Sequence, residues 1–469
     1  MQLKALDTFE EHAHRVLCSR ELPSRELLSF ISSKNSSAMI CQPGDILGRA
    51  GTGAMLSLDA IGKQDLFLTG KEASFFQFSN KRHTPFIKYP SARVVNNPGN
   101  QSGWPFNQTL TFTLNPRTMG DILAGMYLKF KLPPGNYCSE NLGWAMIHKI
   151  EFRIDSQVIE TIKGDWNVVY SQLYYLPEER KALEQLFQGP GIHVPLHFFF
   201  NRRHGNQDTA NPLIHDTYFT PYFLTCAAYG NREIMVTVTF NPATFFTSDG
   251  VCTLPSVTLV TEEFCISDAE KAFLVASKKS QVISFVGNNP THVTGKSPFH
   301  VNLTPSVPVK ALHWFFRDHL YEDAVNTTYY QDRYNFSSNI MATNTTETQS
   351  PIVSETQFYL NGQQLLGLSK NTSDRKRPDG SHYYKFSQPL NHFLTVPDKN
   401  IYTYSFCLRP KDPSPSGAVN FSQLDSQSTK LTGSFYKDAT GRYSINVFYV
   451  GYHQITYQNG FVSLSYASI

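Results

Sequence analysis

The sequence has few charged residues, no long apolar run and almost no excess of either charge. Of its 469 residues, 17% are Asp, Glu, Lys or Arg, and 41 basic side chains against 38 acidic ones give a formal net charge of +3. A charge this small excludes a broad basic surface for a nucleic-acid backbone, so we expect no direct nucleic-acid partner. No apolar run approaches the roughly 18 residues of a membrane-spanning helix, which excludes such a helix by length.

The chain also lacks the paired cysteines of a disulfide or zinc framework. Its seven cysteines are odd in number and show no CxxC spacing, and a chain of this length needs no disulfide bonds to build a core. The first residues are charged and helix-forming rather than basic and then apolar, so no secretory signal is evident. We therefore expect reduced thiols and synthesis in a reducing compartment.

No motif predicts catalysis or a bound cofactor. Residues 295–297 (GKS) resemble the end of a phosphate-binding loop, but Pro290 stands where that motif needs its first glycine. His193 and His197 have a spacing found in some metal sites. No third ligand follows at a recognisable spacing, which favours packing or solvent-facing roles. We expect no enzyme activity, no catalytic residue, no metal and no cofactor.

What the sequence does contain is aromatic side chains in strand-like patterns. Aromatic residues make up 13% of the chain, with 35 Phe and 24 Tyr, a composition typical of pleated, half-buried surfaces. Charged and apolar residues alternate strictly over residues 149–155, which predicts a strand with one wet face. The adjacent carboxylates Glu262 and Glu263 are interpreted as a solvated strand edge. Similar alternation occurs in four further segments, residues 110–114, 127–132, 234–240 and 401–408.

The chain divides into two β-rich halves, each with about eight candidate strands, and this favours an all-β fold of two consecutive double-sheet sandwiches with short helical insertions. The jelly roll is the commonest eight-stranded solution, although the pattern alone does not choose the strand order. Helical spacing occurs around Trp166, after Pro177 and in a capping box at residues 267–270. The expected division is an N-terminal extension at 1–52, partly helical or disordered, a pre-strand arm at 53–74, a first jelly roll at 75–266, a helical linker at 267–280 and a second jelly roll at 281–469.

Turns and loops are marked by Asn and Gly. The pairs at 361–362 and 459–460 (both Asn-Gly) predict two-residue hairpin turns. Residues 322–352 are rich in Asn, Thr and Ser and are interpreted as a long exposed loop. Residues 367–382 are a second expected outward loop, and their basic run at 375–377 is interpreted as solvated.

Nine Asn-x-Ser/Thr sequons occur along the chain. They are read either as glycan acceptors on an exterior surface or as polar loops rich in Asn and Thr, and the absence of a visible secretory signal favours the second interpretation. The candidate acceptors in expected loops are Asn302, Asn326, Asn335, Asn344 and Asn371.

Several long segments carry a resemblance to one family. The stretch GAMLSLDAIGKQDLFLTG (Gly53 to Gly70), followed by FFQFSNKRHTPF (Phe75 to Phe86), resembles the opening of major capsid proteins from nucleocytoplasmic large DNA viruses. PRTMGDILAGMYLKFKLP (Pro116 to Pro133) is similar to a family pattern that leads into a strand. IYTYSFCLRPKDPSPSGAVNFSQLD (Ile401 to Asp425) is the most specific match.

The resemblance covers roughly residues 53–469, with the segments 144–166 and 194–202 in family order. Residues 1–50 have no clear counterpart, which leaves open a virus-specific extension, an upstream translation artefact, or a start at Met39 or Met55. Residues 223–240 differ from the usual sequence of the family but keep the alternation expected of a strand.

The resemblance implies a double jelly roll that forms a homotrimer of pseudo-hexagonal outline and tiles an icosahedral shell. It further implies neighbouring capsomers, minor capsid and penton proteins as partners, possible contact with an inner viral membrane, location in the virion, and synthesis in the host cytoplasm. Three alternatives stay open: a minor or paralogous capsid protein, a carbohydrate-binding β-sandwich, and a hydrolase on a jelly-roll scaffold.

Overall fold

The structure is a computed structural model, and it describes most of the chain after residue 85. The described ranges are 86–94, 104–105, 108–188, 191–202, 222–254, 257–276, 278–338, 351–365, 382–412, 415–436 and 442–464. The expected N-terminal extension at 1–52 and the arm at 53–74 therefore lie outside the described residues, as do residues 375–377.

The first half of the chain forms two four-stranded antiparallel sheets. Sheet I has the order β1-β10-β4-β7 and sheet II the order β3-β8-β5-β6. Because side chains alternate along a strand, β3 shows the burial pattern expected of a sheet with one wet face. The strands are β1 (Phe86–Val94), β3 (Thr109–Leu114), β4 (Ile122–Phe130), β5 (Ile147–Ile154), β6 (Gln157–Lys163), β7 (Ile192–Pro195), β8 (Ile234–Phe240) and β10 (Val257–Ile266).

The second half forms another pair of antiparallel sheets. Sheet III has the order β11-β20-β14-β17, with β12, β18 and β21 beside it, and sheet IV the order β13-β19-β15-β16. The strands are β11 (Lys279–Asn288), β12 (His292–Thr294), β13 (Phe299–Asn302), β14 (Pro308–Asp318), β15 (Val353–Leu360), β16 (Gln363–Gln364), β17 (Ile401–Ser405), β18 (Val419–Asn420), β19 (Lys430–Phe435), β20 (Tyr443–Gln458) and β21 (Phe461–Leu464).

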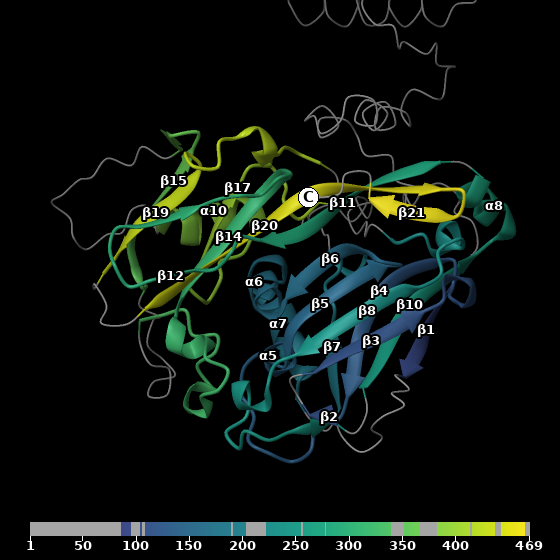
Figure 1. The fold of residues 1–469 in the computed structure, drawn as a ribbon, viewed down its shortest axis with the longest axis horizontal. Helices are drawn as coiled ribbons and strands as arrows, with labels where there is room; N and C mark the ends of the chain where they lie inside the picture. The colour runs from purple at the N-terminus through teal and green to yellow at the C-terminus, as the bar shows by residue number, and fades with distance from the viewer. Residues whose placement is uncertain are drawn as a thin grey trace, which may run out of the picture.

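The two halves repeat one strand order. When the eight main strands of each half are numbered along the chain, sheets I and III both read first, eighth, third, sixth, and sheets II and IV both read second, seventh, fourth, fifth. This order, in which the first strand lies beside the last, is that of a jelly roll. The predicted fold of two consecutive eight-stranded jelly rolls is therefore confirmed, and Figure 1 shows the two sandwiches packed against each other.

Short helices connect the strands. The α-helices are α5 (Leu142–Ala145), α6 (Gly164–Tyr174), α7 (Pro177–Gln185), α8 (Asp268–Ala276) and α10 (Gln388–Phe393), with a π-helical turn η9 (Tyr383–Ser387) before the last. Single 3-10 turns are η1 (Pro116–Thr118), η2 (Phe199–Asn201), η4 (Thr225–Ala228), η5 (Ala243–Phe245), η6 (His319–Glu322), η7 (Thr327–Tyr329) and η10 (Phe421–Gln423), and a minor ribbon joins β2 (Trp104–Pro105) to β9 (Thr253–Leu254). No helix among these is both long and apolar enough to cross a membrane.

The predicted helical insertions and hairpins are present. Helix α8 begins directly after Ser267, whose carbonyl oxygen accepts a hydrogen bond from the Lys271 amide. The turns at Asn361-Gly362 and Asn459-Gly460 have positive φ at both residues, which matches the right-handed twist of the strands they join. Although α8 separates the two sandwiches in sequence, one continuous apolar core runs through both, and their division into separate folding domains stays a prediction.

Two local predictions are wrong. Glu263, expected at a solvated edge, is fully buried inside the first sandwich, where Gly120 N and Thr261 Oγ1 each donate to its carboxylate at 2.5 Å. Its neighbour Glu262 faces outward beside Lys88, since successive side chains of a strand point to opposite faces.

The second wrong prediction concerns part of the loop at residues 322–352, since residues 322–331 are exposed or half-buried as expected. Within this polar stretch, residues 332–337 are buried, because Arg333 draws them inward by donating to several backbone carbonyl groups. Residues 339–350 of the expected loop lie outside the described ranges.

The expectation of reduced thiols stays a prediction, and the structure shows where the described cysteines lie. Five cysteines are free of disulfide bonds, and of these Cys265 is the exposed one, whereas Cys138, Cys226, Cys252 and Cys407 are buried. Burial raises the pKa of both the Cys138 and the Cys226 thiols to about 12.

Candidate functional site between the two sandwiches

The most elaborate site in the structure is the junction at which the two sandwiches meet. Helix α6, the connector between the fifth and sixth strands of the first sandwich, lies against the outer face of sheet III (Figure 1). Its first residue, Gly164, is so close to β5 that a Cβ atom would lie 2.0 Å from the Ile147 carbonyl oxygen. Glycine at this position therefore lets the helix start directly on the sheet that carries it.

Aromatic side chains fill the apolar part of this junction. The Trp166 ring on α6 packs against His313 and Phe448 of sheet III, with ring centroids 5.5 and 5.7 Å apart. Tyr174, eight residues further along the same helix, packs against Phe393 with ring centroids 5.2 Å apart. Since both faces of sheet III are covered, its central strand β14 is buried at almost every residue. A wet face was expected for the antiparallel strands, and sheet III departs from that pattern.

His313 lies at the centre of the junction with no exposed surface. Its Nδ1 is 2.8 Å from Thr403 Oγ1, and its Nε2 is 3.5 Å from the Tyr174 hydroxyl. Burial, assisted by the nearby Lys310 charge, lowers the pKa of His313 to about 3. The imidazole is therefore neutral at any physiological pH and acts as a packing and hydrogen-bonding group.

A buried ion pair crosses the junction next to α6. Glu160 on β6 pairs with Arg202, and both side chains are almost completely buried. The Glu160 carboxylate also accepts from the Val286 amide of the second sandwich at 2.9 Å and from Phe199 N at 2.8 Å. Arg202 donates in turn to the Ser284 carbonyl at 2.5 Å. Burial raises the pKa of Glu160, and the Arg202 charge and the amide donors oppose that shift.

A second ion pair crosses the junction at the start of α6. Arg317 of β14 donates to both carboxylate oxygens of Asp165, at 3.1 and 2.9 Å, and to Glu322 at 2.7 Å. Such a bidentate pair fixes orientation as well as distance. Burial works against the charged form of Glu322. Arg317 and the donors Ser444 and Asn446 outweigh it and lower the Glu322 pKa to about 2.

A third arginine links the sandwiches without a carboxylate. Arg333 donates to the carbonyl groups of Thr244 and Phe245 in the first sandwich and of Tyr321, Asp323 and Asn326 in the second. Its guanidinium also lies over the Phe245 ring, 4.5 Å from the centroid. Burial, together with the nearby Arg317 charge, lowers the pKa of Arg333 to about 10, so the side chain remains a cation at neutral pH.

Further ion pairs and a hydrogen bond connect the two sandwiches at the ends of the junction. Lys399 pairs with Glu140 at 2.7 Å, and Arg180 pairs with Asp398 at 2.7 Å. At the other end, the β20–β21 hairpin docks on the first sandwich, where Gly230 N donates to the Gly460 carbonyl at 2.7 Å. The junction is therefore fixed along its whole length by directional contacts around an apolar centre.

These groups are arranged to hold the two sandwiches together. Each buried carboxylate of the junction accepts from donors of the protein itself, and across the described ranges no group of three His, Cys, Asp or Glu side chains could hold a metal ion. The two histidines of the sequence pattern serve packing. His193 stacks on Tyr127, and the buried His197 lies 2.9 Å from Asn167 Oδ1.

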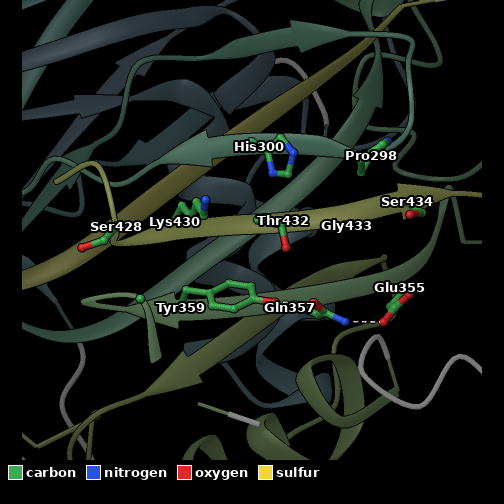
Figure 2. A pocket seen from close by; sticks show the side chains of 11 residues that line it. Pro298, His300, Glu355, Gln357, Tyr359, Ser428, Lys430, Thr432, Gly433 and Ser434 are labelled. Atoms are coloured by element: carbon green, nitrogen blue, oxygen red, sulfur yellow. Dashed lines mark hydrogen bonds between the residues drawn. The ribbon is translucent and has the colours of Figure 1, made fainter. Parts of the chain in front are cut away.

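A second feature is a polar hollow of about 420 Å³ on the outer face of sheet IV. Figure 2 shows its lining side chains on three adjacent strands, β13, β19 and β15. His300, Lys430, Glu355 and Tyr359 offer donors and acceptors to a polar surface. The polar lining indicates that this face of the second sandwich contacts solvent.

The candidate glycan acceptors differ in position. Asn302 is exposed on β13 and Asn326 is half-buried. Asn335 is 1% exposed, and its Oδ1 accepts from Ser337 N and Oγ, so it is not available to a glycosylating enzyme in this fold. The remaining candidates, Asn344 and Asn371, lie outside the described residues.

Comparison with known proteins decides the family. A family described as "Large eukaryotic DNA virus major capsid protein" matches residues 270–459, and a companion family described as "Major capsid protein N-terminus" matches residues 74–220. Together these matches cover more than half of the chain, one in each sandwich. The chain belongs to the major capsid protein family of large eukaryotic DNA viruses.

Curated relatives and solved structures agree with this assignment. The chain is 23% identical over 407 residues to the major capsid protein of Paramecium bursaria Chlorella virus 1, covering 81% of this chain and 87% of the relative. It is 22% identical over 442 residues to the major capsid protein of Pyramimonas orientalis virus, covering 89% and 100%. A chain of the PBCV-1 virus capsid superposes with a TM-score of 0.65 at 17% identity, covering 84% of this chain and 100% of that one, and shows the same fold.

This capsid protein is thus a structural component of the virion, and its junction residues were not singled out from the sequence. Glu160 and Arg202 both lie inside the family-like segments 144–166 and 194–202. The available signal was a lone charge within or beside an apolar run. That signal marks a buried charge but does not identify its partner, which lies 42 residues away along the chain.

Proposed function

We propose that this capsid protein forms a homotrimer of pseudo-hexagonal outline that tiles an icosahedral shell. The observation that carries the proposal is the repeated jelly roll, since two sandwiches with the same strand order are joined in one chain by a rigid junction. Three such chains supply six similar sandwiches, which is the number needed to surround a six-fold position. Close-packed cores resist deformation, so each sandwich serves as a rigid wall of the capsomer.

The partners follow from this role. We infer contacts with neighbouring capsomers, with minor capsid and penton proteins, and with the inner viral membrane, and no direct contact with nucleic acid. The chain is made in the host cytoplasm and acts without catalysis of its own. The free thiols and the small net charge support these inferences.

The glycan acceptors form a separate part of the proposal. If the chain meets glycosylating enzymes, Asn302 and Asn326 are the described candidates that can be modified, because their side chains reach the surface.

The mass of the purified chain in solution tests the trimer. Light scattering is expected to give three times the chain mass of 53.1 kDa, and negative-stain imaging is expected to show particles of hexagonal outline. A species with the mass of one chain, or trimers of another outline, would overturn the proposed capsomer.

A further inference from the structure

One contact inside the chain shows how neighbouring sandwiches pack. The connector between the fifth and sixth strands of the first sandwich, which contains α6, covers the outer face of sheet III in the second. The second sandwich has its own connector at the equivalent place, between β16 and β17, which ends in η9 and α10. The first sandwich has its own equivalent face, the outer face of sheet I.

The end of this second connector exposes apolar side chains. Leu390 and Leu394 are four residues apart at the end of α10, with 56% and 55% of their surfaces exposed, and Leu408 is 75% exposed. The His392 ring lies 3.3 Å from the Leu408 carbonyl oxygen and holds that residue beside the helix. We call these three leucines the leucine patch. Clustered apolar side chains at a surface are typical of protein contact sites.

The outer face of sheet I is suited to such a patch. Ala92, Val260, Tyr127 and Pro195 lie directly opposite one another across all four strands and form a continuous row. We call it the apolar row. Ala92 is exposed, Tyr127 and Pro195 are half-buried, and Val260 between them is buried. The His193 ring stacks on Tyr127 at one end of the row, with ring centroids 5.5 Å apart, and Ala92 at the other end is open to a partner.

The outer face of sheet II has a different character. The corresponding row across its four strands is Thr111, Thr237, Glu151 and Thr161. Its members are polar throughout, as expected for a face in contact with water. The polar hollow on sheet IV shows the same preference. Sheets II and IV therefore have polar outer faces, whereas the outer face of sheet I carries an apolar row flanked by charged side chains, among them the pair Lys88–Glu262.

We propose that the leucine patch of one copy docks on the apolar row of the next copy and repeats between chains the contact that α6 makes within the chain. This rests on the proposed trimer and identifies the surfaces that close it. Each contact joins two different surfaces, and a contact of this kind generates a ring when the rotation closes. Three chains contribute three internal and three external contacts, so six sandwiches complete one turn.

Charge substitutions on each side test the pairing. Leu390→Asp and Ala92→Asp both place a carboxylate at an exposed position of the proposed contact, and Thr111→Asp does the same on the polar face of sheet II. Light scattering is expected to give the mass of a single chain for Leu390→Asp and Ala92→Asp. For Thr111→Asp it is expected to give the mass of three chains. Circular dichroism is expected to match the wild type in all of them.

A mixing experiment separates this pairing from a symmetric one. A chain with Leu390→Asp keeps an unchanged apolar row, and a chain with Ala92→Asp keeps an unchanged leucine patch. An equimolar mixture of the two is therefore expected to form a one-to-one heterodimer through one intact contact. Trimers that persist in both variants would overturn this interface while leaving the proposed trimer standing. A wild-type chain that stays monomeric would contradict both the proposed trimer and the proposed interface.

Discussion

Replacing Glu160 by Gln tests whether the buried charges of the junction hold the two sandwiches together. The substitution keeps the shape of the side chain but removes the counter-charge of Arg202, whose side chain is 3% exposed. It also leaves the donors Arg202, Val286 N and Phe199 N around a single amide oxygen. Breaking one partner of a buried pair costs about 3–5 kcal/mol, because the remaining charge stays desolvated.

The matched control is Glu151→Gln on the wet face of the neighbouring strand β5. Glu151 pairs with Lys149 at 2.9 Å, but the Lys149 side chain is 43% exposed, so the loss is about 0–1 kcal/mol. Unfolding entropy is about 2.1 cal/mol/K per residue, so in a chain of this length 1 kcal/mol corresponds to roughly 1 °C in midpoint. Glu160→Gln is therefore expected to lower the thermal midpoint by about 3–5 °C, and the control by about 1 °C or less.

Calorimetry at matched protein concentration measures the midpoints, since association raises apparent stability. Hydrogen exchange at the Val286 amide reports the junction directly, because this amide donates to Glu160 in the folded protein. Faster exchange at Val286 in Glu160→Gln alone is the expected result. Equal midpoints for the two variants, with Val286 still protected, would refute the view that this pair fixes the junction.

Three further results are expected. Since the folded pKa of Glu322 is about 2 against an ordinary value of 4.5, its contribution is present above pH 4.5 and lost as the pH falls towards 2, and Glu322→Gln should flatten the midpoint-against-pH curve in that window. A thiol reagent should modify the exposed Cys265 in the folded protein and reach Cys138 only on unfolding, which mass spectrometry of the labelled peptides can check. On secretion from a glycosylating cell, Asn302→Gln should remove a mobility shift and Asn335→Gln should not, because Asn335 is buried, and a glycan found on Asn335 would contradict the described burial.

The sequence was most informative where one face of a strand is wet. The alternation over residues 149–155 predicted β5 correctly, because the charged face of that strand meets solvent and its apolar face meets the core. The Asn-Gly pairs located two hairpin turns, because few other residues accept positive φ at both positions. Each of these signals is contained within a few neighbouring residues.

The sequence was least informative where burial depends on the rest of the fold. Glu262 and Glu263 look alike in sequence, yet one faces Lys88 in solvent and the other lies inside the first sandwich. The sequence could not show that both faces of strand β14 are buried. One of these faces is covered by α6, which comes from a segment more than a hundred residues earlier. Residues 332–337 are buried because Arg333 finds carbonyl partners in both sandwiches and Phe336 stacks on Phe315.

The buried charges are better understood as determinants of geometry than as a source of stability. Apolar contact is non-directional, so the aromatic side chains around Trp166 favour close packing of the sandwiches without selecting one angle between them. Arg317 contacts both oxygens of Asp165, and Glu160 accepts from Val286, and these bonds are satisfied at one relative orientation. Because a desolvated charge without its partner is costly, other orientations are penalised. For a capsid subunit, whose role is to present its surfaces at fixed angles, that penalty serves the function directly.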